Sequence, residues 1–169
     1  MWLTAIILGI IGFSHVFSNF SEKETIEQNF TYEADSSKSY TISIITYSKK
    51  QDNGTIHLPH NSVIQTSLHD TWKIYQKVDY EIEYTEEKNI GIEIQASSRG
   101  ETEKIAKELA LNLASRVHVT KDSITFPEYI ELCKPKKWRN QHIHLFISIP
   151  KHIDYLEDTV QKNSLEVRK

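Results

Sequence analysis

The sequence has little of what several functional classes require. Its 169 residues include one cysteine, Cys133, so neither a disulfide within the chain nor a thiolate-based metal site can form. Glycine and proline number five and four, which excludes collagen-like and low-complexity chains. Basic residues are not in excess, because the net charge is −3 and the pI is near 6.2. A nucleic-acid partner is therefore not expected, and Cys133 is expected to be a small, partly buried side chain.

Sequence motifs of common enzyme classes are also missing. The chain has no GxSxG nucleophile elbow, no phosphate-binding glycine loop, no dinucleotide fingerprint and no HExxH zinc motif. Two clusters keep an enzyme open as an alternative. Asp79, Glu81 and Glu83 share one strand face and suit acid–base chemistry, while His142 and His144 can bind a metal if a third ligand converges. A solvated strand face explains both clusters more simply, so we predict no catalytic residue, no metal and no cofactor.

The N-terminal residues 2–13 are apolar and uncharged. They fit the roughly 7 to 15 apolar residues of a signal peptide, and extension through Phe20 approaches a membrane-spanning length. We interpret residues 1–20 as a signal, an uncleaved anchor or the end of a longer membrane region. A buried segment of a cytosolic protein is the alternative. The expected location is the cell membrane, with the domain facing the periplasm or the exterior; alternatively the protein is secreted.

The rest of the chain is patterned mainly for strands. Residues 40–47 are β-branched and aromatic, as is typical of a strand. Residues 73–85 and 90–97 alternate apolar and polar side chains on either side of a short polar turn, which predicts a β-hairpin with one solvated face. In the second segment Ile90, Ile92 and Ile94 are expected to point inward. Further strands are predicted at about 25–32, 116–120, 123–126 and 141–149.

One helix is predicted at about 101–115. Ile105, Leu109 and Leu113 recur at helical spacing, and Glu103 in the first turn suits the helix dipole. The expected fold is mainly β (α+β): an antiparallel sheet, a β-sandwich or a solenoid-like domain with this helix packed on it. The expected segments are a signal or anchor at 1–20, a polar spacer and first strand at 21–39, the β-rich domain at 40–156 and a polar tail at 157–169.

The clearest basic cluster surrounds a tryptophan. It suits anionic lipid head groups or cell-wall polymers, although a solvated loop whose aromatic ring packs down is an alternative. We therefore expect the membrane as a partner through residues 1–20, and an envelope protein or an anionic polymer as a partner of the loop. The residues of this possible binding loop are Lys134, Lys136, Lys137, Trp138 and Arg139.

The second half of the chain contains three short motifs in a recognisable order. They are Ser98-Arg99-Gly100-Glu101-Thr102 before the alanine-rich helix, Phe126-Pro127-Glu128-Tyr129 after a short hairpin, and Lys137-Trp138-Arg139-Asn140-Gln141 before a strand that ends at Pro150. Over about residues 70–155 this order resembles the β-rich, toast-rack or adhesin-like C-terminal region of Bacteroidetes PspC-domain (phage shock protein C related) envelope proteins. The resemblance implies a membrane-tethered, extracytoplasmic β-domain connected with envelope stress or membrane integrity. It implies no catalytic residues.

We therefore predict a non-enzymatic, membrane-tethered domain with a structural or binding role at the cell envelope. A secreted adhesin or assembly subunit is one alternative, and it predicts an exposed apolar patch or an open sheet edge. A hydrolase-type enzyme that uses the acidic cluster or a histidine-bound metal is the other alternative. That enzyme requires a concave pocket in which these groups converge.

Overall fold

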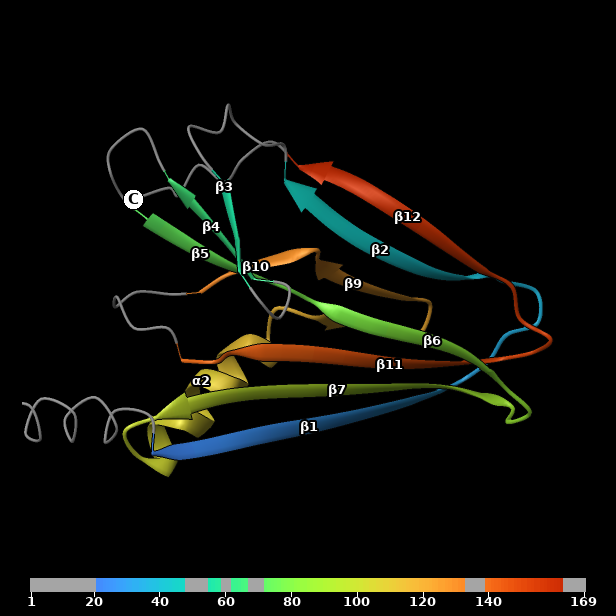
Figure 1. Cartoon of the computed structure of the whole chain (residues 1–169). Coiled ribbons are helices and arrows are strands. Elements are labelled where there is room, and N and C mark those ends of the chain that lie inside the picture. Colours follow the sequence, from blue (N-terminus) through green and yellow to red (C-terminus); the bar gives the residue numbers. More distant parts are fainter. Residues whose placement is uncertain (1–20, 48–54, 59–61, 67–71, 133–138, 163–169) are drawn as a thin grey trace, which may run out of the picture.

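The computed structural model describes residues 21–47, 55–58, 62–66, 72–132 and 139–162 (Figure 1). These residues form three four-stranded sheets and one helix. The prediction of a mainly β domain with one packed helix is confirmed. Two of the three sheets contain parallel as well as antiparallel pairs, and the third is purely antiparallel. Residues 1–20 lie outside the described part, so the predicted signal or anchor stays a prediction. Within the described part, no helix combines the length and the hydrophobicity that crossing a membrane requires.

Sheet A is built around two long, alternating strands. Its order is β1 (Glu22–Glu33), β7 (Asn89–Gly100), β11 (His142–Pro150) and β6 (Asp79–Thr85). The β1–β7 and β7–β11 pairs are antiparallel, whereas β11 and β6 are parallel. Every second side chain of β7 and β11 is buried, because successive side chains of a strand point to opposite faces. Sheet A therefore has an inner apolar face and an outer polar face.

Two chain segments pass from one sheet to another, and they involve sheets B and C. Sheet B has the order β12 (Tyr155–Lys162), β2 (Tyr40–Tyr47), β9 (Ser123–Pro127), β8 (His118–Val119). Sheet C has the order β10 (Tyr129–Glu131), β5 (Trp72–Lys77), β4 (Ser62–Thr66), β3 (Thr55–Leu58). Strand β5 runs into β6 through Val78, and β9 runs into β10 through Glu128. The Val78 amide donates to the Glu128 carbonyl at 3.0 Å, so the two segments change sheets at the same point.

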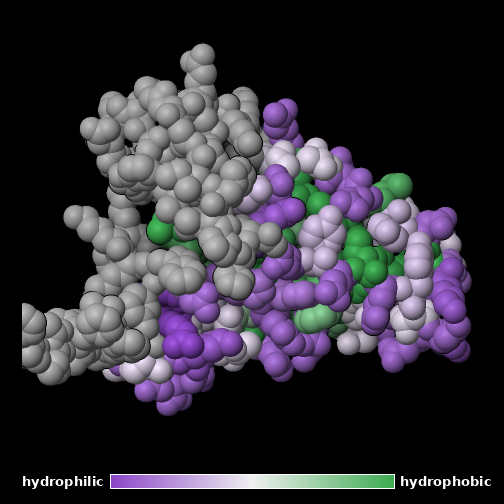
Figure 2. All heavy atoms as spheres, in the orientation of Figure 1, coloured by the Kyte–Doolittle hydropathy of each residue, from purple (hydrophilic) through white to green (hydrophobic). Residues whose placement is uncertain are grey.

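The core lies against the inner face of sheet A. Tyr40 and Ile42 of β2 and Phe126 of β9 are almost completely buried there. The rings of Tyr80 in β6 and Phe126 lie 5.3 Å apart between their centroids, which joins sheets A and B through side chains. Hydrophilic residues cover most of the described surface that Figure 2 shows, and hydrophobic residues emerge mainly in the middle of that face. Burial of apolar area between the sheets therefore holds the layers together.

Helix α2 (Glu103–Ala114) packs on β7 and β1 at one end of sheet A (Figure 1). Thr102 caps its N-terminus, since the threonine Oγ1 accepts a hydrogen bond from the Ile105 amide at 3.3 Å. Ala106 and Ala110 are completely buried, and their small side chains let the helix axis approach the sheet closely. The predicted helix is confirmed, with the observed ends inside the expected range.

The predicted hairpin between residues 73–85 and 90–97 is wrong. Strand β11 lies between β6 and β7 and pairs with both. Its inward side chains are completely or almost completely buried, so the central position in the sheet removes more apolar area from water than an edge position would. The predicted single strand over 73–85 is also divided at Val78, where the chain passes from sheet C to sheet A.

The predicted polar tail differs from the structure over residues 157–162. These residues belong to β12, which pairs in parallel with β2 along its whole length. Most β12 side chains are exposed, including Leu156 at 59%, so backbone hydrogen bonds to β2 hold the strand at the edge of sheet B. Because the side chains of an edge strand are exposed, their polarity does not reveal that the backbone pairs with a neighbouring strand. Residues 163–169 lie outside the described part of the chain.

Candidate functional site

The outer face of sheet A collects most of the polar side chains that the sequence singles out. We define this face by the side chains that point away from the core on its four strands. On β7 it includes Gly91, Glu93 and Gln95, which alternate with buried isoleucines as the sequence predicts. The members from the other strands are Glu27, Asn29 and Thr31 of β1, His142, His144, Phe146 and Ser148 of β11, and Asp79, Glu81 and Glu83 of β6.

The acidic cluster and the histidine pair are neighbours across the parallel strands β6 and β11. The His142 Nε2 atom lies 3.7 Å from Asp79 Oδ2, and the His144 Nε2 atom lies 3.5 Å from Glu81 Oε1. His144 also stacks on Phe146, with 4.2 Å between the ring centroids and 19° between the planes. The structure therefore joins two sets of residues that the sequence treats separately.

This arrangement lies on an open sheet face. The Glu81 side chain is 69% exposed, and Asp79 is 32% exposed. Within the described residues, no three His, Cys, Asp or Glu side chains converge on a point that suits a metal ion. His144 Nε2 is buried and makes no hydrogen bond, so its contact with Glu81 is an ion-pair contact only when the ring is protonated. These pairs link β6 to β11 at the surface.

A shallow depression lies on the same face, toward the end of sheet A that is remote from helix α2. Its volume is about 490 Å³. The Ser148 hydroxyl donates to Glu83 Oε1 at 3.0 Å, and the Gln95 amide Nε2 donates to Glu93 Oε1 at 2.6 Å. The main outward-facing residues of the lining are Asn29, Thr31, Glu83, Gly91, Glu93, Gln95, Phe146 and Ser148. Sequence alternation places these side chains outward, but their grouping depends on the strand order.

The predicted binding loop lies largely outside the described part of the chain. That holds for Lys134, Lys136, Lys137 and Trp138, and for Cys133 beside them. Arg139 is described: its side chain is only 12% exposed, and its Nη2 atom lies 3.9 Å from Glu101 Oε1. Its carbonyl accepts a hydrogen bond from the Arg99 amide at 2.9 Å, so Arg139 lies beside the C-terminal end of β7.

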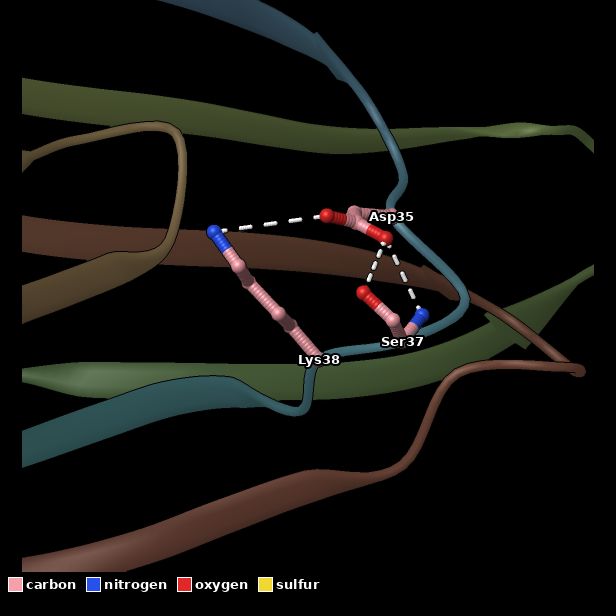
Figure 3. A network of polar contacts seen from close by, with 3 residues as sticks. All are labelled: Asp35, Ser37 and Lys38. Atoms are coloured by element: carbon pink, nitrogen blue, oxygen red, sulfur yellow. Dashed lines mark hydrogen bonds and ion pairs between the residues drawn. The ribbon is translucent and has the colours of Figure 1, made fainter.

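The turn between β1 and β2 is held by a small polar network (Figure 3). The Ser37 hydroxyl and amide donate to Asp35 Oδ1 at 2.6 and 3.0 Å, and Lys38 Nζ lies 4.0 Å from Asp35 Oδ2. The side-chain hydrogen bond from Ser37, followed by its backbone hydrogen bond, lowers the pKa of the Asp35 carboxyl. All three residues are exposed, and the network closes the turn without forming a pocket.

Tyr80 on β6 points inward and is partly buried. Its hydroxyl donates to Glu157 Oε1 at 2.8 Å, which ties β6 to β12. Burial, followed by this hydrogen bond, raises the pKa of Tyr80 from 10.0 to about 12. Since the folded-state pKa lies above the unfolded one, the unfolded chain loses its proton first. Tyr80 therefore has no effect on the pH dependence of stability below about pH 10, and it lowers stability as the pH rises from there toward 12.

We predict that Tyr80→Phe removes one tyrosine that titrates near pH 12. Ultraviolet absorbance titration of the folded wild type and the variant measures this difference directly. The variant is also expected to lose less stability between pH 10 and 12 than the wild type. Burial likewise raises the pKa of Tyr40, so Tyr40 does not obscure the comparison in this range. A difference spectrum whose midpoint lies near pH 10 would contradict the described environment of Tyr80.

Comparison with known proteins gives one match. Residues 64–167 match the model of a toast-rack domain found in some PspC proteins. No curated protein and no solved structure matches the chain. The matched range contains helix α2 and all strands from β5 to β12, and it confirms the resemblance that the sequence shows over about residues 70–155.

Proposed function

Because the chain belongs to the family of toast-rack domains found in some PspC proteins, we propose that it is a membrane-tethered, extracytoplasmic domain that binds a partner without catalysing a reaction. Family membership associates the chain with the cell envelope. The tether, the side of the membrane and the binding role are the parts that we propose. The expected role is structural or connected with envelope stress.

The exposure of the candidate acid–base groups supports a non-catalytic role. Enzyme sites usually place such groups in a concave, largely enclosed pocket. Here Glu81 is 69% exposed on an open sheet face, and His142 is 41% exposed beside Asp79. A surface of this kind suits recognition of a partner better than it suits exclusion of water from a reaction.

The position of β1 supports the tether. The apolar residues 2–13 are followed by a strand that already begins at Glu22. Glu22 pairs with Gly100, so the chain enters sheet A at the end where helix α2 packs. A short connection from an apolar segment into a twelve-residue strand would hold sheet A close to the membrane surface.

Fractionation of the native, full-length protein tests this proposal. We expect membrane association that resists salt and carbonate, an intact mass that retains residues 1–20, and proteolysis only from the periplasmic or outer side. A full-length protein that is recovered in the cytosol would contradict the proposal. Digestion of the domain from the cytoplasmic side would also contradict it.

A secreted adhesin or assembly subunit is the second candidate, and the edge strands favour it. Among the described strands, β1 and β12 end the orders of sheets A and B. An edge strand offers unpaired backbone groups to a strand of another chain. A soluble product outside the cytoplasm whose mass lacks residues 1–20 would favour this candidate over the tethered domain.

A further inference from the structure

We propose that the outer face of sheet A docks a basic segment of another polypeptide, with a lysine or arginine side chain seated over Phe146 between Glu83 and Glu93. This inference rests on the proposed binding function and gives its partner a chemical class. The observations behind it are the shape of the depression, the orientation of its carboxylates, the aromatic ring in its lining and the sign of the surrounding charge.

The shape follows from the register of the four strands. Gly91 lies beside Thr31 on one side and Ser148 on the other, and Ser148 lies beside Glu83. Because Gly91 has no side chain and Ser148 has a small one, the sheet surface is low along this row. A Cβ atom at Gly91 would lie 3.6 Å from the Ser148 Cβ atom and would begin to fill the depression.

The carboxylates on both sides of the depression are oriented by neighbouring side chains. Ser148 on β11 holds Glu83 of β6, and Gln95 holds Glu93 two residues away on β7. Such hydrogen bonds reduce the side-chain freedom that a carboxylate loses when it binds a cation. Glu83 and Glu93 therefore present oriented carboxylates from the strands on either side of β11, with Glu83 beside Ser148 and Glu93 beside Phe146.

The ring of Phe146 completes the site. His144 stacks on one face of this ring at 4.2 Å. Since His144 and Ser148 lie on opposite sides of Phe146 along β11, the other ring face points toward Ser148 and the depression. A lysine ammonium or an arginine guanidinium gains cation–π attraction at such a face, and the flanking carboxylates add charge-assisted hydrogen bonds.

The charge around the depression selects a cationic partner. Its described lining contains Glu83 and Glu93 and no lysine or arginine. The adjacent outward positions of sheet A add Glu27, Asp79 and Glu81. On β1 and β7 the outward cations Lys23 and Arg99 pair at the helix-bearing end of the sheet. At the other end Lys151 is paired with Glu86, and Lys88 lies in the exposed turn before β7. A polypeptide segment fits this open face better than a single ion, because it can contact the depression and the neighbouring acidic row together.

Binding of a labelled peptide to the full-length protein in a neutral detergent tests the proposal. The probe is a dye-labelled hexapeptide of alternating lysine and glycine, and a glutamate–glycine hexapeptide serves as the anionic counterpart. We expect saturable binding of the lysine peptide by fluorescence anisotropy, weakening as salt screens the charges, and no binding of the glutamate peptide. The double variant Glu83→Gln/Glu93→Gln is expected to weaken binding at least tenfold, and Gly91→Val, which fills the depression, is expected to weaken it similarly.

The matched control is Glu87→Gln/Glu108→Gln, which removes the same charge from exposed positions outside this face. It is expected to change the affinity less than twofold. Equal weakening by the two double variants would overturn the proposal, because it would indicate attraction to net charge alone. Absence of saturable binding would also overturn it. Either failure leaves the membrane tether untouched, since fractionation tests the tether independently, and far-ultraviolet circular dichroism shows whether each variant is folded.

Discussion

Leu145→Ala is expected to lower the free energy of unfolding by about 2 to 5 kcal/mol. Leu145 is completely buried at the centre of β11. Its strand pairs on one side with β7, where Ile94 is its neighbour, and on the other side with β6, where Tyr80 is its neighbour. Removal of the isobutyl group leaves a cavity in the core against the inner face of sheet A, and the hydrogen-bonded strands on both sides of β11 limit any collapse of the surroundings. Domains of this size are stable by only about 5 to 15 kcal/mol, so the loss is a large share of the total.

Denaturant unfolding followed by circular dichroism measures this effect. Leu156→Ala is the matched control, because it makes the same chemical change at a side chain that is 59% exposed. The control is expected to stay within about 0.5 kcal/mol of the wild type. If the two variants lost equal stability, β11 would not be the buried central strand of sheet A.

Local periodicity predicts a large part of this fold. The strand expected at 40–47 is β2 with the same ends, and the helix expected at 101–115 contains α2. The alternation in 90–97 also places the isoleucines inward and Glu93 outward as expected. These features depend on which side of a single element faces the core, and side-chain spacing encodes that information directly.

Strand order is the part that spacing does not encode. The short turn before residue 89 predicts a hairpin, yet β11, from more than forty residues later in the chain, occupies the place beside β7. A strand with a fully apolar inner face buries the most apolar area at the centre of a sheet. The residues that cover this face come from parts of the chain that are far apart in the sequence. The parallel pairs β11–β6, β12–β2 and β2–β9 are non-local for the same reason, because parallel strands need a long connection between them.

The candidate site shows the same division. The sequence identifies Asp79, Glu81 and Glu83 as one group, and His142 and His144 as another. Their pairing across β6 and β11 appears only when the two strands are placed side by side. The depression over Gly91 has no motif of its own, since each lining residue looks like an ordinary outward position of its strand. The site therefore depends on the order of the strands in sheet A and on the register of their pairing.

Gly100→Ala is expected to lower the free energy of unfolding by about 2 to 3 kcal/mol through overpacking. Gly100 is the last residue of β7 and belongs to the Ser98-Arg99-Gly100 motif, which is part of the family resemblance. A Cβ atom there would lie 2.6 Å from the Ala106 amide nitrogen and 3.0 Å from the Thr102 carbonyl oxygen. These are backbone atoms of the first helical turn, so the clash cannot be relieved by turning a side chain. The φ angle is not in the left-handed region, so the cost is steric alone.

Gly91→Ala on the same strand is the control. Its Cβ atom would meet only the Ser148 Cβ atom, at 3.6 Å, which is an ordinary contact. Because glycine within a strand costs roughly 0.5 to 1 kcal/mol relative to alanine, this variant is expected to be neutral or slightly more stable than the wild type. Chemical denaturation compares the two, and amide hydrogen exchange should show the loss of protection from Gly100→Ala concentrated in helix α2, which has to move away from β7. Equal stability of the two variants would mean that α2 does not approach the end of β7 as closely as described. The expected result would instead give a physical reason for glycine at position 100: it lets helix α2 begin directly against the strand that the helix covers.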